Sequence, residues 1–231
     1  MVRPRSADEA LTLTIDGTEP PSAASVEALT EICDRAEDLA HRQGGAGTVT
    51  VHVAGAPEGA WTSGLNVGLV TKWERVLRRL ERLPAVTVAV ASGDCGGSAL
   101  DVLLATDIRV AATGTRLLVA RDGAATWPGT AGFRLVQQAG LGRIRRAVLF
   151  GLPIGAADAV RLGIVDELAD DPAAALEAVA ELVAGLAGKE VAIRRQLLFD
   201  ATTTGFEDAL GAHLAACDRA LRREAAVEGP L

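Results

Sequence analysis

Apolar residues alternate with polar ones in some segments and recur at helical spacing in others, which divides the chain into strands and helices. Residues 11–16, LTLTID, alternate and predict a half-buried strand. After the turn and N-cap signal Pro20-Pro21-Ser22, apolar residues between Val26 and Ala40 follow the spacing of a helix. The same reasoning predicts strands at 48–53 and 86–91 and, between them, a helical stripe from Leu69 to Leu83 that Pro84 ends.

The second half of the chain is predominantly helical. A glycine-rich segment, SGDCGGS at 92–98, leads into a short helix at 99–106, two brief strands at 107–112 and 115–120, and a loop with Trp127-Pro128-Gly129. From about residue 130 the pattern is helical except for a strand at 164–168, and Ala-rich helices are predicted at 172–187, 188–199 and 204–226. Strands and helices that alternate first and give way to helices predict an α/β fold. We expect a core domain at 1–170 and a helical segment at 171–231.

Composition narrows the class of protein. The 231 residues are 49% hydrophobic and 23% charged, which is typical of a globular chain with one sizeable core. A net charge of −7 with scattered arginines argues against nucleic-acid binding. Cys33, Cys95 and Cys217 form no CxxC pair, so neither a disulfide framework nor a zinc site is predicted. We find no signal peptide or membrane span in the pattern and expect a cytoplasmic protein without membrane contact.

Three motifs in a fixed order resemble the crotonase (enoyl-CoA hydratase) superfamily. Residues 86–111, VTVAVASGDCGGSALDVLLATDIRVA, are similar to its signature of strand, glycine-rich turn, helix and second strand. Residues 127–168 are similar to the run that begins PG-x-GG in that family, and WTSGLN at 61–66 resembles its F-S-A-G-x-D loop. The resemblance covers roughly residues 11–200. It implies a crotonase-like spiral of ββα units, with C-terminal helices that build trimers or hexamers.

Two glycine-rich turns carry the expected chemistry. A thioester that becomes an enolate gathers negative charge on its oxygen, and preorganised N–H groups stabilise that charge. The first turn of a helix presents such N–H groups without internal partners. By the resemblance, the donors of this oxyanion hole are the backbone N–H groups of Leu65 and Ser98, and substrate binding involves Trp61, Gly64, Gly97 and Trp127. The alternative is that both turns only pack strand ends against helices.

The two glutamates of hydratases in this family are both replaced. The resemblance aligns the first with Asp101, which can act as a general acid or base or can be a solvated carboxylate near a helix N-terminus. It aligns the second with Arg121, whose guanidinium stays protonated and cannot take up a proton. Arg121 can clamp an anionic oxygen, with Asp122 supplying a carboxylate, or it can be a surface residue of a degenerate site.

Within the superfamily, residues 78–112 and the later TWPG resemble the small crotonase homologues of 3,5-dihydroxyphenylglycine biosynthesis in glycopeptide-antibiotic pathways. The resemblance implies a dehydratase-like lyase that acts with a type III polyketide synthase to form 3,5-dihydroxyphenylacetyl-CoA. The alternative is a non-catalytic partner that binds and stimulates that synthase. The only cofactor-like group expected is the coenzyme A of the acyl-CoA substrate, and no metal is expected.

Overall fold

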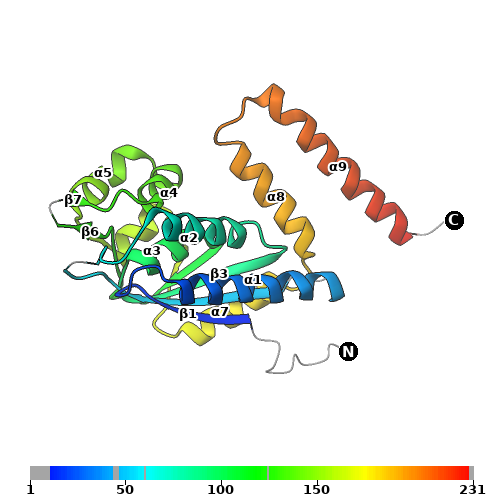
Figure 1. Cartoon of the computed structure of the whole chain (residues 1–231). Coiled ribbons are helices and arrows are strands. Elements are labelled where there is room, and N and C mark those ends of the chain that lie inside the picture. Colours follow the sequence, from blue (N-terminus) through cyan, green and yellow to red (C-terminus); the bar gives the residue numbers. More distant parts are fainter. Residues whose placement is uncertain (1–10, 44–46, 60, 124, 229–231) are drawn as a thin grey trace.

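The computed structural model describes residues 11–43, 47–59, 61–123 and 125–228 (Figure 1). The strands are β1 (Leu11–Asp16), β2 (Gly47–Gly55), β3 (Ala85–Gly96), β4 (Ile108–Ala111), β5 (Arg116–Leu118), β6 (Arg121–Asp122), β7 (Ala125–Thr126), β8 (Ile154–Gly155) and β9 (Glu167–Leu168). The helices are α1 (Ala23–Gln43), α2 (Val67–Leu80), α3 (Gly97–Leu104), α4 (Thr130–Ala139), α5 (Leu141–Phe150), α6 (Ala156–Arg161), α7 (Pro172–Leu182), α8 (Gly188–Asp200) and α9 (Phe206–Glu228).

A parallel sheet with the order β1-β2-β3-β4-β9 forms the centre of the fold. β3 is long enough to pair twice: Val88–Ala91 lie beside β4, and Asp94–Gly96 lie beside β5. β5 in turn pairs with β8 in the antiparallel sense, and β6 and β7 form a separate hairpin. The expected α/β fold is confirmed, and its parallel strands with intervening helices are those of a crotonase-like chain.

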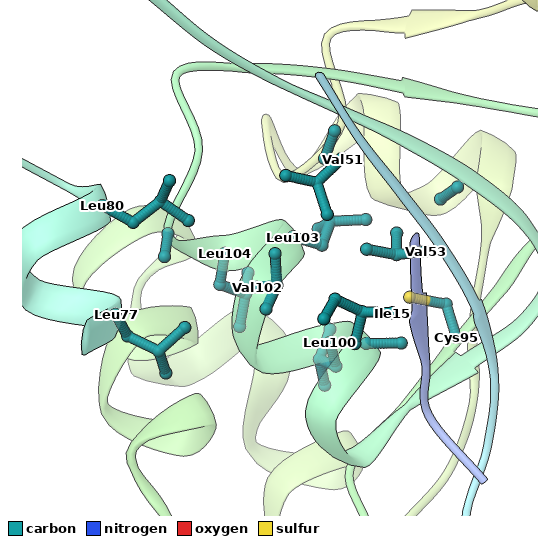
Figure 2. Close-up of a cluster of buried hydrophobic side chains, with 14 of the residues drawn as sticks. Ile15, Val51, Val53, Leu77, Leu80, Cys95, Leu100, Val102, Leu103 and Leu104 are labelled. Carbon is teal, nitrogen blue, oxygen red and sulfur yellow. The ribbon is translucent and has the colours of Figure 1, made fainter. Parts of the chain in front are cut away.

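Alternate residues of β3 face two different hydrophobic clusters. On one face, β3 packs with α1, α2 and α3, and the side chains of this large core come together from β1, β2, α2 and α3 in Figure 2. On the other face, Val86 and Val88 pack against Val179 of α7 and nearby Val183. Because both faces are covered, β3 is apolar almost throughout, as a buried parallel strand must be.

A buried arginine attaches α8 to this core. Arg195, 7% exposed, donates from Nε and Nη2 to the two carboxylate oxygens of Asp107, both at 2.6 Å. It also donates to the carbonyl oxygens of Glu81, Leu83 and Ala85. The Asp of the T-D-I-R motif therefore has a structural contact in this chain. Beyond α8, helix α9 extends away from the sheet (Figure 1).

The structure corrects several predicted boundaries. α2 ends at Leu80 and not at Pro84, because the residues between form tight turns and a residue before proline avoids helical geometry. The segment after residue 91, predicted as a turn, continues as strand to Gly96 because it pairs with β5. The β6–β7 hairpin in the predicted loop and the short strand β8 were not predicted at all.

Candidate active site

The start of α3 is packed so closely that only glycine fits there. Gly97 has φ +50°, and a Cβ placed on it would lie 2.7 Å from Cγ of Pro57 and 3.0 Å from Cζ2 of Trp61. A Cβ on Gly96 would lie 3.0 Å from the carbonyl oxygen of Leu118. The backbone at this helix start is therefore held directly against the loop after β2 and the end of β5.

Ser98 follows in the first turn of α3, where a backbone N–H has no acceptor within the helix. Its side chain is 2% exposed, and its hydroxyl donates to the carbonyl oxygen of Glu19 at 2.9 Å. The hydroxyl is thus held by a main-chain acceptor, which leaves the backbone N–H as the group that the site can use.

The second predicted donor, the N–H of Leu65, lies in a turn before α2. Gly64 has φ +84°, and the Leu65 N–H donates to the carbonyl oxygen of Thr62 at 3.0 Å. Asn66 then caps α2 by accepting from the N–H of Leu69 at 2.9 Å. A thioester oxygen would have to replace or share the Thr62 carbonyl as the acceptor for Leu65, so the role of Leu65 in an oxyanion hole stays a prediction.

Two of the predicted substrate-binding residues meet directly. The rings of Trp61 and Trp127 pack edge to face, with centroids 6.0 Å apart at 78°. The backbone N–H of Trp127 donates to the carbonyl oxygen of Ala120 at 2.7 Å, which connects the loop before α4 to the residue preceding Arg121. The loops on either side of the candidate site are therefore joined through this aromatic pair.

Asp101 lies on α3, one turn after Ser98, and has a partner that sequence reasoning missed. Its Oδ2 accepts a hydrogen bond from the indole Nε1 of Trp73 at 3.0 Å. Burial raises the pKa of the Asp101 carboxyl from 3.8 to about 6, although the Trp73 hydrogen bond and the positive charge of Arg134 act in the opposite direction. A carboxyl that titrates near neutral pH is suited to both release and uptake of a proton.

A buried ionic cluster lies on the same side of α3. Arg134 of α4 is 6% exposed and forms ion pairs with Glu74 and Glu81, at 2.6 and 2.7 Å. It also donates to the hydroxyl oxygen of Thr130 at 2.7 Å. Since Glu74 is next to Trp73 on α2, the cluster fixes α2 against α4 around the hydrogen-bonded Asp101.

Arg121 and Asp122 line a cavity of about 620 Å³. The other lining residues come from the loop after β2, from the segment around β5 and β6, and from the end of α5: Ala56, Pro57, Gly59, Thr62, Leu118, Val119, Ala120, Gly123 and Gly151. Arg121 is exposed and makes no ion pair within 4.0 Å in the part of the chain that the structure describes. Its guanidinium is therefore available to an anionic ligand.

The structure brings together some of the predicted residues and separates others. Gly97, Trp61 and Trp127 form one packed group beside the cavity, and Arg121 and Asp122 line it. Asp101 is not among the lining residues and faces Trp73 instead. Trp73 belongs to the hydrophobic core, and its indole N–H in addition serves Asp101. The sequence signal for this contact is the lone aspartate in the otherwise apolar helix GSALDVLL, since a largely buried carboxylate requires a partner.

Within the described residues, no group of three His, Cys, Asp or Glu side chains is arranged to hold a metal ion. In the same ranges, no helix has the length and apolar character needed to cross a membrane.

The fold as a whole is similar to that of solved enoyl-CoA hydratase structures. An enoyl-CoA hydratase structure from Thermoplasma volcanium matches with a TM-score of 0.77 at 16% identity, over 94% of this chain and 91% of that one. One from Mycobacterium smegmatis matches with a TM-score of 0.76 at 19% identity, over 95% and 90% of the two chains. At these identities, the likeness concerns the fold alone.

A sequence model of the family described as enoyl-CoA hydratase/isomerase matches residues 64–226, and the chain belongs to this family. Members of the family handle acyl-CoA thioesters. A relative from Amycolatopsis orientalis, described as "Enoyl-CoA-hydratase", is 60% identical over 215 residues, which are 93% of this chain and 97% of the relative. A "Probable enoyl-CoA hydratase" from Bacillus subtilis is 28% identical over 70% of this chain and 64% of its own length.

Proposed function

We propose that this protein is a lyase that removes water from a CoA-bound acyl group through an enolate. The observation that carries the proposal is Asp101, a carboxyl with a pKa of about 6 on α3, one turn after Ser98, whose backbone N–H lies in the first turn of that helix. In an elimination, Asp101 removes the proton next to the thioester carbonyl. The N–H groups of Leu65 and Ser98 hold the enolate oxygen. Asp101 then passes its proton to the oxygen on the β-carbon, which leaves as water.

We further propose that the acyl group is a polyketide chain derived from malonyl-CoA and that the product is 3,5-dihydroxyphenylacetyl-CoA. One observation supports this substrate: residues 78–112 and TWPG resemble the crotonase homologues of 3,5-dihydroxyphenylglycine biosynthesis. The synthase that supplies the chain would be a type III polyketide synthase.

In this proposal, Arg121 stabilises an anionic oxygen of the substrate. It lines the cavity without an ion-pair partner in the described ranges, and an enolate or phenolate oxygen of a cyclising polyketide carries the negative charge that a guanidinium binds. Asp122, next to it in the cavity wall, is the carboxylate available to accept a proton from a ring hydroxyl.

The deciding experiment measures product formation from malonyl-CoA by the cognate synthase, with and without this protein. Wild type should raise the yield of 3,5-dihydroxyphenylacetyl-CoA, and Asp101→Asn and Arg121→Ala should reduce the increase. If both variants stimulate as well as wild type, the catalytic role of these residues is wrong. Hydration of crotonyl-CoA, followed by absorbance, separates this proposal from a general fatty-acid hydratase, which would hydrate that ester efficiently.

A second function, non-catalytic stimulation of the synthase, is favoured by one particular observation. Asp101 is hydrogen-bonded to Trp73 and does not line the cavity that Arg121 and Asp122 line. The Asp101 carboxyl and the Arg121 guanidinium therefore do not lie in the wall of the same cavity. On this alternative, the protein binds the synthase or its intermediate and raises turnover without chemistry of its own. Full stimulation by Asp101→Asn would identify it.

We also propose that the helical segment at 171–231 assembles the protein into a trimer or hexamer in the cytoplasm. α8 and α9 carry large apolar side chains on their surface, among them Leu198, Phe199, Phe206, Leu214 and Leu221. Such side chains are usually covered in an oligomer. Sedimentation equilibrium should give three or six times the chain mass of 23.8 kDa, and a monomer at micromolar concentration would contradict the assembly.

A further inference from the structure

Trp61 has a buried hydrogen-bond donor without an acceptor. The residue is 5% exposed, and its indole Nε1 finds no hydrogen-bond partner in the part of the chain that the structure describes. An indole N–H can only donate, so a buried one without an acceptor is unfavourable. Buried polar groups in native proteins are nearly always paired, which means that this one calls for an explanation.

The orientation of the ring places this N–H at the start of α3. Cζ2 of Trp61 is the atom that lies 3.0 Å from the position of a Cβ on Gly97. Cζ2 and Nε1 are both bonded to Cε2, so the indole nitrogen is only two bonds away from the atom that contacts the first turn of the helix. The N–H therefore lies close to the helix start that contains Ser98.

The surrounding residues connect this position to the cavity. Gly59 and Thr62, on either side of Trp61 in the sequence, line the 620 Å³ cavity, as does Pro57, which lies against Gly97 beside Trp61. Packing alone does not require the donor, because phenylalanine, found at this position in the family's loop pattern, fills such a space without an N–H.

We propose that the Trp61 indole N–H donates a hydrogen bond to a second oxygen atom of the acyl chain, beyond the thioester carbonyl. Trp61 then determines specificity: it favours acyl-CoA esters with a keto or hydroxyl oxygen near the thioester over esters with a hydrocarbon chain. The inference rests on the proposed function, because it requires that an acyl-CoA occupies this site.

The test compares two esters of equal chain length by isothermal titration calorimetry. Acetoacetyl-CoA carries a keto oxygen on its third carbon, and butyryl-CoA does not. Wild type should bind acetoacetyl-CoA about 3- to 10-fold more tightly than butyryl-CoA, the ratio expected for one additional hydrogen bond. Trp61→Phe should bind the two esters equally, through weaker binding of acetoacetyl-CoA alone.

A measurement on wild type makes the test independent of the stability of the variants. The indole ¹H–¹⁵N resonance that is missing from Trp61→Phe should move downfield when acetoacetyl-CoA is added, and should move much less with butyryl-CoA. If Trp61→Phe does not fold, Trp73→Phe and Trp127→Phe assign the other two indole resonances, and the remaining one belongs to Trp61.

The possible failures are distinguishable. If wild type binds both esters equally, or if Trp61→Phe weakens both by the same factor, the donor role of Trp61 is wrong while acyl-CoA binding stands. If neither ester binds to wild type, the proposed function fails and this inference fails with it.

Discussion

Asp101→Asn should make the folded protein more stable at neutral and alkaline pH while it removes the group that we propose moves the proton. Asparagine has nearly the same shape as aspartate, and its carbonyl oxygen can still accept the hydrogen bond from Trp73. What the substitution removes is a negative charge that the surrounding protein destabilises, as the raised pKa of Asp101 indicates. A gain in stability together with a loss of activity is the pattern expected of a carboxyl retained for chemistry.

The magnitude follows from the pKa. The rise from 3.8 to about 6 corresponds to about 3 kcal/mol, at about 1.36 kcal/mol for each pH unit. Because part of Asp101 remains accessible to water, we expect about 1–2 kcal/mol, or a rise in Tm of about 2–8 °C. Above pH 6 the carboxyl is ionised in both the folded and the unfolded protein, so the wild type bears the whole penalty. As the pH falls from 6 to 3.8, the folded protein takes up a proton before the unfolded chain does, and the penalty disappears.

The assay is thermal or urea unfolding of wild type and Asp101→Asn at one protein concentration, at pH 8 and again near pH 4. The difference in stability should favour the variant at pH 8 and vanish near pH 4. Asp107→Asn is the matched control, since it removes a carboxylate that accepts two hydrogen bonds from buried Arg195, and it should destabilise the protein at pH 8. An Asp101→Asn protein that is less stable than wild type at pH 8, or a gain that does not depend on pH, would refute the reasoning.

Three further substitutions test contacts in the core and at the start of α3. Arg195→Ala should lower the free energy of unfolding by about 3–5 kcal/mol in urea, because it leaves the Asp107 carboxylate without its buried partner, whereas Arg194→Ala on the exposed side of α8 should cost less than about 1 kcal/mol. Equal losses of stability in the two variants would contradict the role of Arg195 in attaching α8 to the core. Gly97→Ala should lower the free energy of unfolding by about 1–3 kcal/mol and weaken acyl-CoA binding in calorimetry. The reason is that φ +50° and the contacts with Pro57 and Trp61 leave no room for a Cβ. A variant that melts and binds like wild type would show that this backbone can relax. Ser98→Ala should lower the free energy of unfolding by about 1 kcal/mol, because it removes the hydrogen bond to the carbonyl oxygen of Glu19. Product formation should continue, because the backbone N–H remains. Abolished activity would instead assign the chemistry to the hydroxyl.

The strongly patterned elements could be predicted from the sequence, and the irregular ones could not. β1 has the bounds predicted from LTLTID, and α1 follows the apolar spacing after Ser22. Pairing with a distant partner leaves a weaker trace in the local sequence. Asp94, Cys95 and Gly96 continue as strand because β5 pairs with all three and the end of β2 pairs with Cys95. The two-residue strands β6 and β7 have no periodicity to detect.

For the candidate site, motif order located the turns, but the contacts of the side chains depend on the tertiary structure. Spacing placed Asp101 one turn after Ser98, as found. It could not show that Asp101 faces Trp73, because that contact joins residues 28 positions apart on two helices. Nor could it separate Arg121, which lines the cavity, from Arg134, which is buried between Glu74 and Glu81.

The placement of the tryptophans allows the candidate site to be followed by intrinsic fluorescence. The chain has three tryptophans and no tyrosine, so nearly all of its near-ultraviolet fluorescence comes from Trp61, Trp73 and Trp127. Two of these indoles lie edge to face beside the start of α3, and the third is hydrogen-bonded to Asp101. A ligand that binds at the loops should change the emission of Trp61 and Trp127, and protonation of Asp101 should change the emission of Trp73. Titrations of substrate and of pH can therefore be followed separately, without attaching a dye.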